Sequence, residues 1–286
     1  MRILAVIFIV ILSNTSAWGQ YRDYGNLNTL DLKGKIKSLE EREFKIIEKI
    51  EDTVRLDLTV QRNILFNQKD DNIGIWVIYL KSNNKNFTGS HYNEQGTKLK
   101  DSILFYKNDS LVVKGIGIYE SNKNTTKITI YDKSSNIIQC VENTYDENKN
   151  KKKTYAYLSN GDFSFKSRFD YDKKGNIAKS YSYYTKNFVG RISKYKYDSN
   201  NNRTEFKVLD ANGNQIERTV YVYDEFENMI ESHSFNAENV LTMKSKYETE
   251  YDEKSNWTKM TKYEYLAPSF EVVNGIMVEE RAIEYY

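Results

Sequence analysis

The residue types that most often carry reactive chemistry are few in this chain and widely spaced. It has two histidines, His91 and His233, and one cysteine, Cys140, which are the side chains that bind transition metals or act as nucleophiles. If they lie in β-strands, the alternation of side chains predicts opposite faces of a sheet for the two histidines. Cys140 is predicted on the face of His91 but four strands away, which is at least about 19 Å at the usual strand spacing. The sequence therefore predicts no metal site and no Cys–His dyad.

Carboxylates are the remaining candidates, because a pair of Asp or Glu side chains can hydrolyse a glycosidic bond. An aromatic residue followed by Asp recurs along the chain, as in Phe169-Asp-Tyr-Asp-Lys-Lys-Gly-Asn176. A calcium site is disfavoured, because each unit supplies one carboxylate and Lys often follows it. Asp close to Gly or Asn is instead typical of a turn, in which Asp accepts backbone hydrogen bonds and Gly adopts positive φ. We interpret these Asp residues as turn formers and predict a positive φ at Gly175. No catalytic, cofactor-binding or metal-ligating residue is assigned.

These units belong to a regular repeat that must build the fold. The aromatic residues before the turns follow one another at steps that alternate between 12 and 14 residues from Tyr119 to Phe235. A strand plus a turn has about this length, so the repeat predicts consecutive antiparallel strands. The repeat positions are Phe66, Tyr79, Tyr92, Tyr106, Tyr119, Tyr131, Tyr145, Tyr157, Tyr171, Tyr183, Tyr197, Leu209, Tyr223, Phe235, Tyr251 and Tyr263.

The fold predicted from this repeat is all-β: a long antiparallel up-and-down meander that forms a curved or rolled sheet. Alternate repeat positions line opposite edges of the sheet, and we expect them to pack a thin, Tyr-rich core rather than to form a ligand platform. Counting by twos from the repeat positions places Tyr181 and Tyr195 on one face, and Phe206 and Val208 on the other. A sheet inserted in lipid is disfavoured, because segments such as 244–250 carry charges on both faces, and each lipid-facing charge costs about 2–4 kcal/mol.

The unit Tyr-Asp-x-x-Gly-Asn at 171–176, with its echoes at 131, 145, 197, 223 and 251, resembles the YD repeats of RHS-type proteins. It is more similar still to short secreted YD-repeat-like proteins of Gram-negative bacteria, as are residues 32–38, 256–259 and 281–286. The resemblance implies a β-meander and export, in a group that is generally of unknown function. The chain has no RHS core and no toxin domain, so a toxin-enclosing shell is not implied.

The N-terminal part of the chain differs from the repeat. Residues 1–19 are predicted to be a signal peptide, because Arg2, a short apolar run and small residues at 17 and 19 precede a cleavage point before Gln20. Residues 20–53 are predicted to pack on the sheet or to start it. Their apolar spacing also fits a charged helix over 37–52, whereas the resemblance implies strands. Residues 54–286 form the predicted repeat domain.

Composition limits the function further. Basic and acidic residues nearly balance, at 42 and 40, so the sequence lacks the segregated basic surface of a nucleic-acid-binding protein. No segment after the signal peptide is predicted to cross a membrane as a helix. The sequence predicts an exported protein, in the periplasm, on the cell surface or outside the cell. It predicts a non-catalytic β-repeat scaffold or binding protein that needs no cofactor, with an envelope glycan or protein as its candidate partner. The alternative is an envelope hydrolase that acts on glycans through an Asp/Glu pair.

Overall fold

In the part of the chain that the structure describes, all of the secondary structure is β-strand. The structure is a computed structural model that describes residues 35–50, 53–66, 72–79, 84–92, 98–107, 110–120, 124–271 and 273–286. Its 18 strands form a single antiparallel sheet. The strands are β1 (Ile36–Ile50), β2 (Thr53–Phe66), β3 (Asn72–Tyr79), β4 (Asn84–Tyr92), β5 (Lys98–Lys107), β6 (Ser110–Glu120), β7 (Thr125–Asp132), β8 (Ile137–Tyr145), β9 (Lys151–Leu158), β10 (Phe163–Tyr171), β11 (Ile177–Tyr183), β12 (Val189–Tyr197), β13 (Arg203–Asp210), β14 (Gln215–Tyr223), β15 (Met229–Phe235), β16 (Leu241–Tyr251), β17 (Trp257–Leu266) and β18 (Val273–Tyr285).

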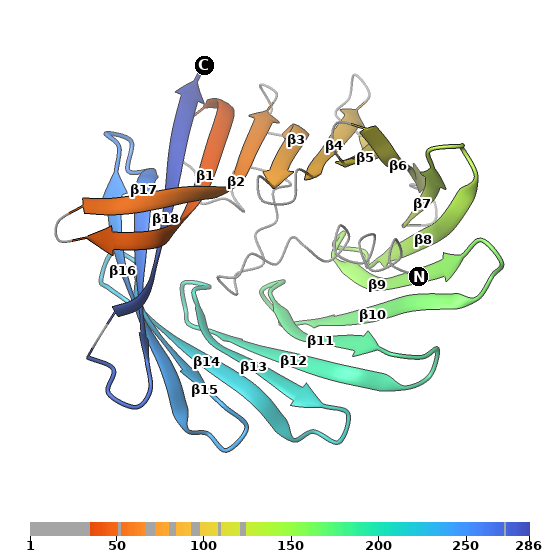
Figure 1. Ribbon diagram of the computed structural model, residues 1–286. Coiled ribbons are helices and arrows are strands. Elements are labelled where there is room, and N and C mark those ends of the chain that lie inside the picture. Colours follow the sequence, from red (N-terminus) through yellow and green to blue (C-terminus); the bar gives the residue numbers. More distant parts are fainter. Residues whose placement is uncertain are drawn as a thin grey trace.

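Each strand pairs with the strand that follows it in the sequence, which is the predicted up-and-down meander. The first strand also pairs with the last, from Ile36 opposite Tyr285 to Lys45 opposite Met277. The pairing therefore returns to its start, and each described strand has a neighbour on both sides. Figure 1 shows the sheet curving round until β1 and β18 lie side by side. The prediction of an all-β, antiparallel, rolled sheet is confirmed.

The aromatic repeat positions lie at the ends of strands, as the spacing predicts. Tyr145, Tyr171, Tyr197 and Tyr223 are the last residues of β8, β10, β12 and β14. A register shift of one residue accompanies each of these strand ends, where the chain enters or leaves a turn. Such β-bulges increase the local twist of the strands, which favours a sheet that curves.

The two faces of the sheet differ sharply in burial. One face, called here the crowded face, carries most of the buried residues, among them Val141, Ala156, Phe165, Ser167, Val208, Tyr221, Ser232, Tyr247 and Arg281. The other, called here the open face, carries mainly half-buried and exposed residues, among them Tyr157, Lys166, Tyr181, Lys194, Lys207 and Arg218, although Leu209 and Val278 on it are buried. Cross-strand partners point to the same side of a sheet, so these assignments follow directly from the register.

The predicted division of residues between the faces is wrong at several positions. Phe206 lies opposite Tyr195 and Val208 opposite Ser193, so both belong to the crowded face together with Tyr195. Tyr181, by contrast, lies on the open face, opposite Arg168 and Ile192. Counting by twos fails because the one-residue bulges at the turns change the alternation from one strand to the next.

The core on the crowded face is thin and only partly apolar. An apolar cluster spans β5 to β10 and consists of Phe105, Val113, Ile130, Val141, Ala156 and Phe165. The crowded face also contains polar side chains that form hydrogen bonds with one another. Thr154 donates to the side-chain oxygen of Asn143 at 2.7 Å, and the Ser232 and Tyr247 hydroxyls lie 3.0 Å apart. A tyrosine buries its ring while its hydroxyl keeps a hydrogen bond, which explains how such a sheet can pack with so few aliphatic residues.

The N-terminal predictions are tested in part. The segment from 36 to 50 is the strand β1, so the helix alternative for it is wrong, and this segment starts the sheet as the resemblance implied. The strand pairs of β1 with β2 and β18 override its helical apolar spacing. The predicted signal peptide at 1–19 and residues 20–34 lie outside the described residues. Within the described residues, no helix is long and apolar enough to cross a membrane.

Candidate functional site

Many turns of the repeat begin with an Asp whose carboxylate accepts hydrogen bonds from groups of the same turn. In the turn at 172–176, one oxygen of Asp172 accepts the backbone N–H groups of Lys174 at 2.8 Å and Asn176 at 2.9 Å. The other accepts the side-chain amide of Asn176 at 3.1 Å. The fourth residue, Gly175, has a φ of 87°, which confirms the prediction. The same Asp-to-Asn turn begins at Asp132, Asp146, Asp198, Asp210 and Asp224.

Electrostatics agree with a structural role for these carboxylates. The side-chain amide of Asn214, with backbone N–H groups of the same turn, lowers the pKa of Asp210 below its ordinary value. The pKa of Asp224 is lowered in the same way by Asn228. A carboxylate that accepts several hydrogen bonds stays ionised and is a poor general acid at neutral pH. The described residues also contain no group of three or more His, Cys, Asp or Glu side chains placed to hold a metal ion.

The tyrosines that precede these turns bind the neighbouring strand. Tyr171 donates its hydroxyl to the carbonyl of Lys151 at 2.8 Å, Tyr197 to that of Ile177 at 3.2 Å, and Tyr223 to that of Arg203 at 3.0 Å. The carbonyl belongs in each case to the first residue of the preceding strand. Burial raises the pKa of Tyr197 to about 12. These contacts support the predicted packing role of this tyrosine ladder.

The histidines and the cysteine are not brought together. Cys140 on β8 and His233 on β15 both lie on the open face, because Cys140 faces Tyr157 and His233 faces Val220 and Lys244. This corrects the predicted division between faces, for the reason given above, but the intervening strands β9 to β14 separate the two residues. His233 lies 3.1 Å from the Glu231 carboxylate. His91 belongs to β4, and its side chain lies outside the described residues.

The seam between β1 and β18 holds a buried ion pair that the sequence did not predict. Two nitrogens of Arg281 lie 2.9 Å from one carboxylate oxygen of Glu41, and both side chains are at most 1% exposed. Arg62 on β2 approaches the other oxygen at 3.9 Å. The Arg281 guanidinium also lies 3.5 Å from the centre of the Trp257 ring. Burial of two charges is tolerated only with such paired geometry, so this cluster fixes the register in which the sheet closes.

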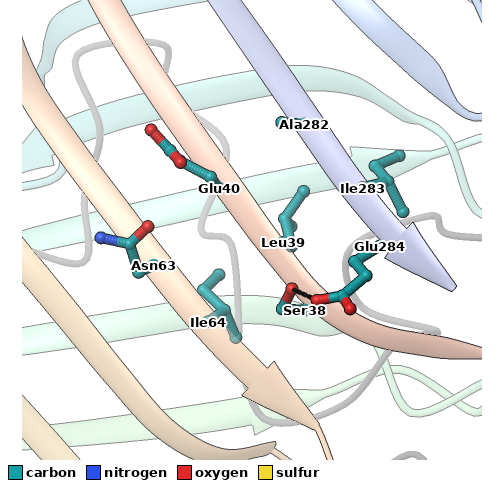
Figure 2. Close-up of a pocket in the computed structure, with 8 residues that line it drawn as sticks. All are labelled: Ser38, Leu39, Glu40, Asn63, Ile64, Ala282, Ile283 and Glu284. Carbon is teal, nitrogen blue, oxygen red and sulfur yellow. Dashed lines mark hydrogen bonds between the residues drawn. The ribbon is translucent and has the colours of Figure 1, made fainter. Parts of the chain in front are cut away.

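A pocket of about 360 Å³ lies at the same seam (Figure 2). Leu39, Ile64 and Ile283 supply its apolar lining, and Glu40 and Glu284 supply carboxylates. Glu284 is 2.6 Å from the Lys37 amine, and this contact lowers its pKa. Glu40 is 2.6 Å from a guanidinium nitrogen of Arg42. Both carboxylates therefore have a cationic partner, and the pKa of Glu284 is lowered, whereas a general acid needs a raised pKa.

The open face carries a row of positive charges that runs across four strands. Lys179 on β11 lies opposite Lys194 on β12, Lys194 opposite Lys207 on β13, and Lys207 opposite Arg218 on β14. We call these four residues the basic row. In the sequence they are three ordinary strand lysines and an arginine, and only the register places them side by side.

Aromatic rings stand beside the basic row on the same face. The Arg168 guanidinium lies 4.0 Å from the centre of the Tyr181 ring, and the Lys166 amine lies 4.0 Å from the centre of the Tyr183 ring. Tyr155 and Tyr157 on β9 stack with ring centres 6.0 Å apart. Together, β9 to β14 present cations and tyrosine rings on one continuous surface of the sheet.

Comparisons with known proteins give only distant likenesses. No known family and no curated protein matches the chain. Among solved structures it is similar to a porin-like protein from Bacteroides uniformis, with 8% identity, 87% of this chain and 96% of that chain covered, and a TM-score of 0.49. It is also similar to a chain of the Photorhabdus luminescens Tc holotoxin pore, with 9% identity, 76% and 14% covered, and a TM-score of 0.29. A LolA superfamily protein from Nitrosomonas europaea shows 9% identity, 88% and 86% covered, and a TM-score of 0.26. These likenesses are too distant to assign a family or a function.

Proposed function

We propose that this protein is an exported, non-catalytic β-repeat scaffold that binds its partner on the open face of the sheet. The observation that carries the proposal is the contrast between the two kinds of charged group. The turn carboxylates and the seam carboxylate Glu41 are held by hydrogen bonds or ion pairs of the fold. The lysines of the basic row and the tyrosines beside them are instead presented together on the open face.

Export and the relation to short secreted YD-repeat-like proteins are part of this proposal. The Tyr-Asp turn unit supports them, because the structure uses every element of that unit: the tyrosine binds the preceding strand, and the Asp and Asn close the turn. The predicted signal peptide supports export to the periplasm, the cell surface or the exterior of the cell. An envelope glycan or an envelope protein is the partner that this location favours.

The alternative is an envelope hydrolase that cleaves glycans through a carboxylate pair. Such an enzyme needs a protonated acid beside a carboxylate, in a pocket that admits a sugar. The seam pocket has the space, but Glu40 and Glu284 beside it are paired with Arg42 and Lys37. Their pairing supports the non-catalytic proposal.

The test exposes the purified protein to an array of bacterial envelope polysaccharides and measures both retention and the release of reducing ends. We expect retention of a subset of glycans with no release above that of buffer. The control is the Glu284→Gln variant, which removes a pocket carboxylate and should leave retention unchanged. Release of reducing ends that disappears in Glu284→Gln would establish the hydrolase instead.

A further inference from the structure

We propose that the basic row binds a linear acidic glycan, a polysaccharide that carries carboxylates along its chain. The inference rests on the proposed binding function and adds to it the chemical class of the ligand and the residues that recognise it. Its starting point is the register of β11 to β14, which stacks four cations directly opposite one another.

This register is unfavourable for folding. Like charges directly opposite each other on neighbouring strands destabilise a sheet, and the basic row contains three such pairs in succession. Acidic residues offset the row only towards its ends: Asp170 lies opposite Lys179 and binds Arg168 at 3.2 Å, and Glu205 binds Lys196 at 3.0 Å and Arg218 at 3.5 Å. Lys194, at the centre of the row, lies opposite cations on both neighbouring strands, and a local feature that opposes the fold indicates a site for a ligand.

The lysines of the row are free to meet that ligand. Within the described part of the chain, Lys179, Lys194 and Lys207 form no salt bridge, and Lys179 and Lys194 are exposed. Arg218, at the far end, lies 3.5 Å from Glu205, and Lys179, at the other end, lies opposite Asp170. Successive strands are about 4.8 Å apart, so the four backbone positions of the row follow one another at even intervals across the sheet. An evenly charged linear polymer complements such a line better than a single anion does.

The neighbouring side chains favour a carboxylated glycan over other polyanions. Lysine offers a compact point charge, so three lysines in succession suit a polymer with evenly spaced single anionic groups, whereas the two-pronged geometry of arginine suits bidentate contacts with carboxylates or phosphates. Tyr181 lies on the same face of β11 as Lys179, and the Arg168 guanidinium lies 4.0 Å from the centre of its half-buried ring, so an aromatic side chain and cations together line the surface that a sugar chain would cover. The balanced net charge of +2 lacks the broad positive field that nucleic acids require.

The decisive variant is Lys194→Glu, because Lys194 lies between Lys179 and Lys207 and the substitution breaks the row at its centre. The matched control is Lys127→Glu, which makes the same charge change at an exposed lysine on β7. The probes are polygalacturonate as the acidic glycan, dextran as the neutral one, random double-stranded DNA, and phosphatidylglycerol vesicles. Binding to the full chain is measured by calorimetry at low and at high salt.

We expect polygalacturonate to bind the unmodified protein and to bind more weakly as salt rises, because screening weakens contacts between exposed charges. Lys194→Glu should weaken this binding at least tenfold and should not lower the melting temperature, whereas Lys127→Glu should change the affinity less than twofold. A purely structural role for Lys194 would instead lower the melting temperature.

Other outcomes overturn the inference. Equal binding of dextran and polygalacturonate, insensitive to Lys194→Glu, would remove the basic row as the site and leave the proposed binding function intact. Equal or tighter binding of DNA or vesicles would show a general polyanion surface, not a glycan site. Absence of polygalacturonate binding would reject the inference, and cleavage of the glycan would reject the proposed function itself.

Discussion

Replacing Arg281 by Met should destabilise the protein by about 3 kcal/mol, because it leaves the buried Glu41 carboxylate without its closest cation. Removal of one partner from a buried ion pair typically costs 3–5 kcal/mol, in contrast to exposed pairs. The lower end of about 3 kcal/mol applies here, since Arg62 stays 3.9 Å from the second oxygen of Glu41. The methionine keeps an apolar contact with Trp257, so little further loss is expected from that ring.

The double variant Glu41→Met/Arg281→Met tests whether the loss of stability in Arg281→Met comes from the unpaired Glu41 carboxylate. With both charges of the pair gone, neither partner is left buried alone, and stability should return to within about 1 kcal/mol of the original, as apolar replacements of buried pairs often do. The exposed pair Lys259–Glu250, at 3.2 Å and with side chains 41% and 68% exposed, is the matched control. Lys259→Met should cost less than about 1 kcal/mol.

Urea unfolding of Arg281→Met, Glu41→Met, the double variant and the control measures these energies. Hydrogen exchange should show the loss for Arg281→Met first in β1 and β18, the strands that the pair joins. The reasoning is refuted if the losses of the two single variants simply add in the double variant, or if Lys259→Met costs as much as Arg281→Met.

The remaining predictions concern the turns and the open face. Gly175→Val should lower the free energy of unfolding in urea by about 1–2 kcal/mol, because the φ of 87° at this position strains a branched side chain. Gly175→Asn should lower it less, since Asn201 adopts a φ of 71° at the equivalent position of another turn. Equal urea midpoints for the two variants would contradict the turn assignment. Asp210 has a lowered pKa in the folded state, so its stabilising contribution is complete above its ordinary pKa of about 3.9 and is lost as pH falls through the folded-state value. Asp210→Asn should therefore weaken the loss of stability below about pH 4, and an unchanged pH profile would contradict this. Lys194→Glu should raise stability by about 0.5–1 kcal/mol, as like-charge pairs become opposite-charge pairs, and a lower melting temperature would contradict the cost assigned to the basic row.

The strand order and the turns could be predicted from the sequence because both are local. The step of 12 or 14 residues sets strand length, and Asp172 and Gly175 determine their turn within five residues. The first strand could not be predicted from its own spacing. Its apolar pattern fits a helix equally well, and what decides its structure is pairing with β18, more than 200 residues away in the sequence.

The candidate sites escaped prediction for a related reason. A bulge of one residue at a turn reverses the alternation of all residues beyond it, so the faces of Tyr181 and Phe206 cannot be counted from the repeat positions. The basic row and the Glu41–Arg281 pair exist only through cross-strand register. The sequence does show lysines that alternate with aromatic residues within 192–197. This pattern does not show which lysines of different strands lie opposite each other.

The central claim is that the Tyr-Asp repeat builds the sheet and is not itself a ligand site, and two tyrosines of the ladder test it most directly. Tyr197 and Tyr223 each bury a ring on the crowded face and bind the preceding strand through the hydroxyl. The measurement is urea unfolding and polygalacturonate binding on the same preparations of Tyr197→Ala and Tyr223→Ala. Each substitution should lower stability by about 2–4 kcal/mol, while binding per folded molecule stays within twofold. Unchanged stability with abolished binding would contradict the claim and make the tyrosine ladder the functional surface.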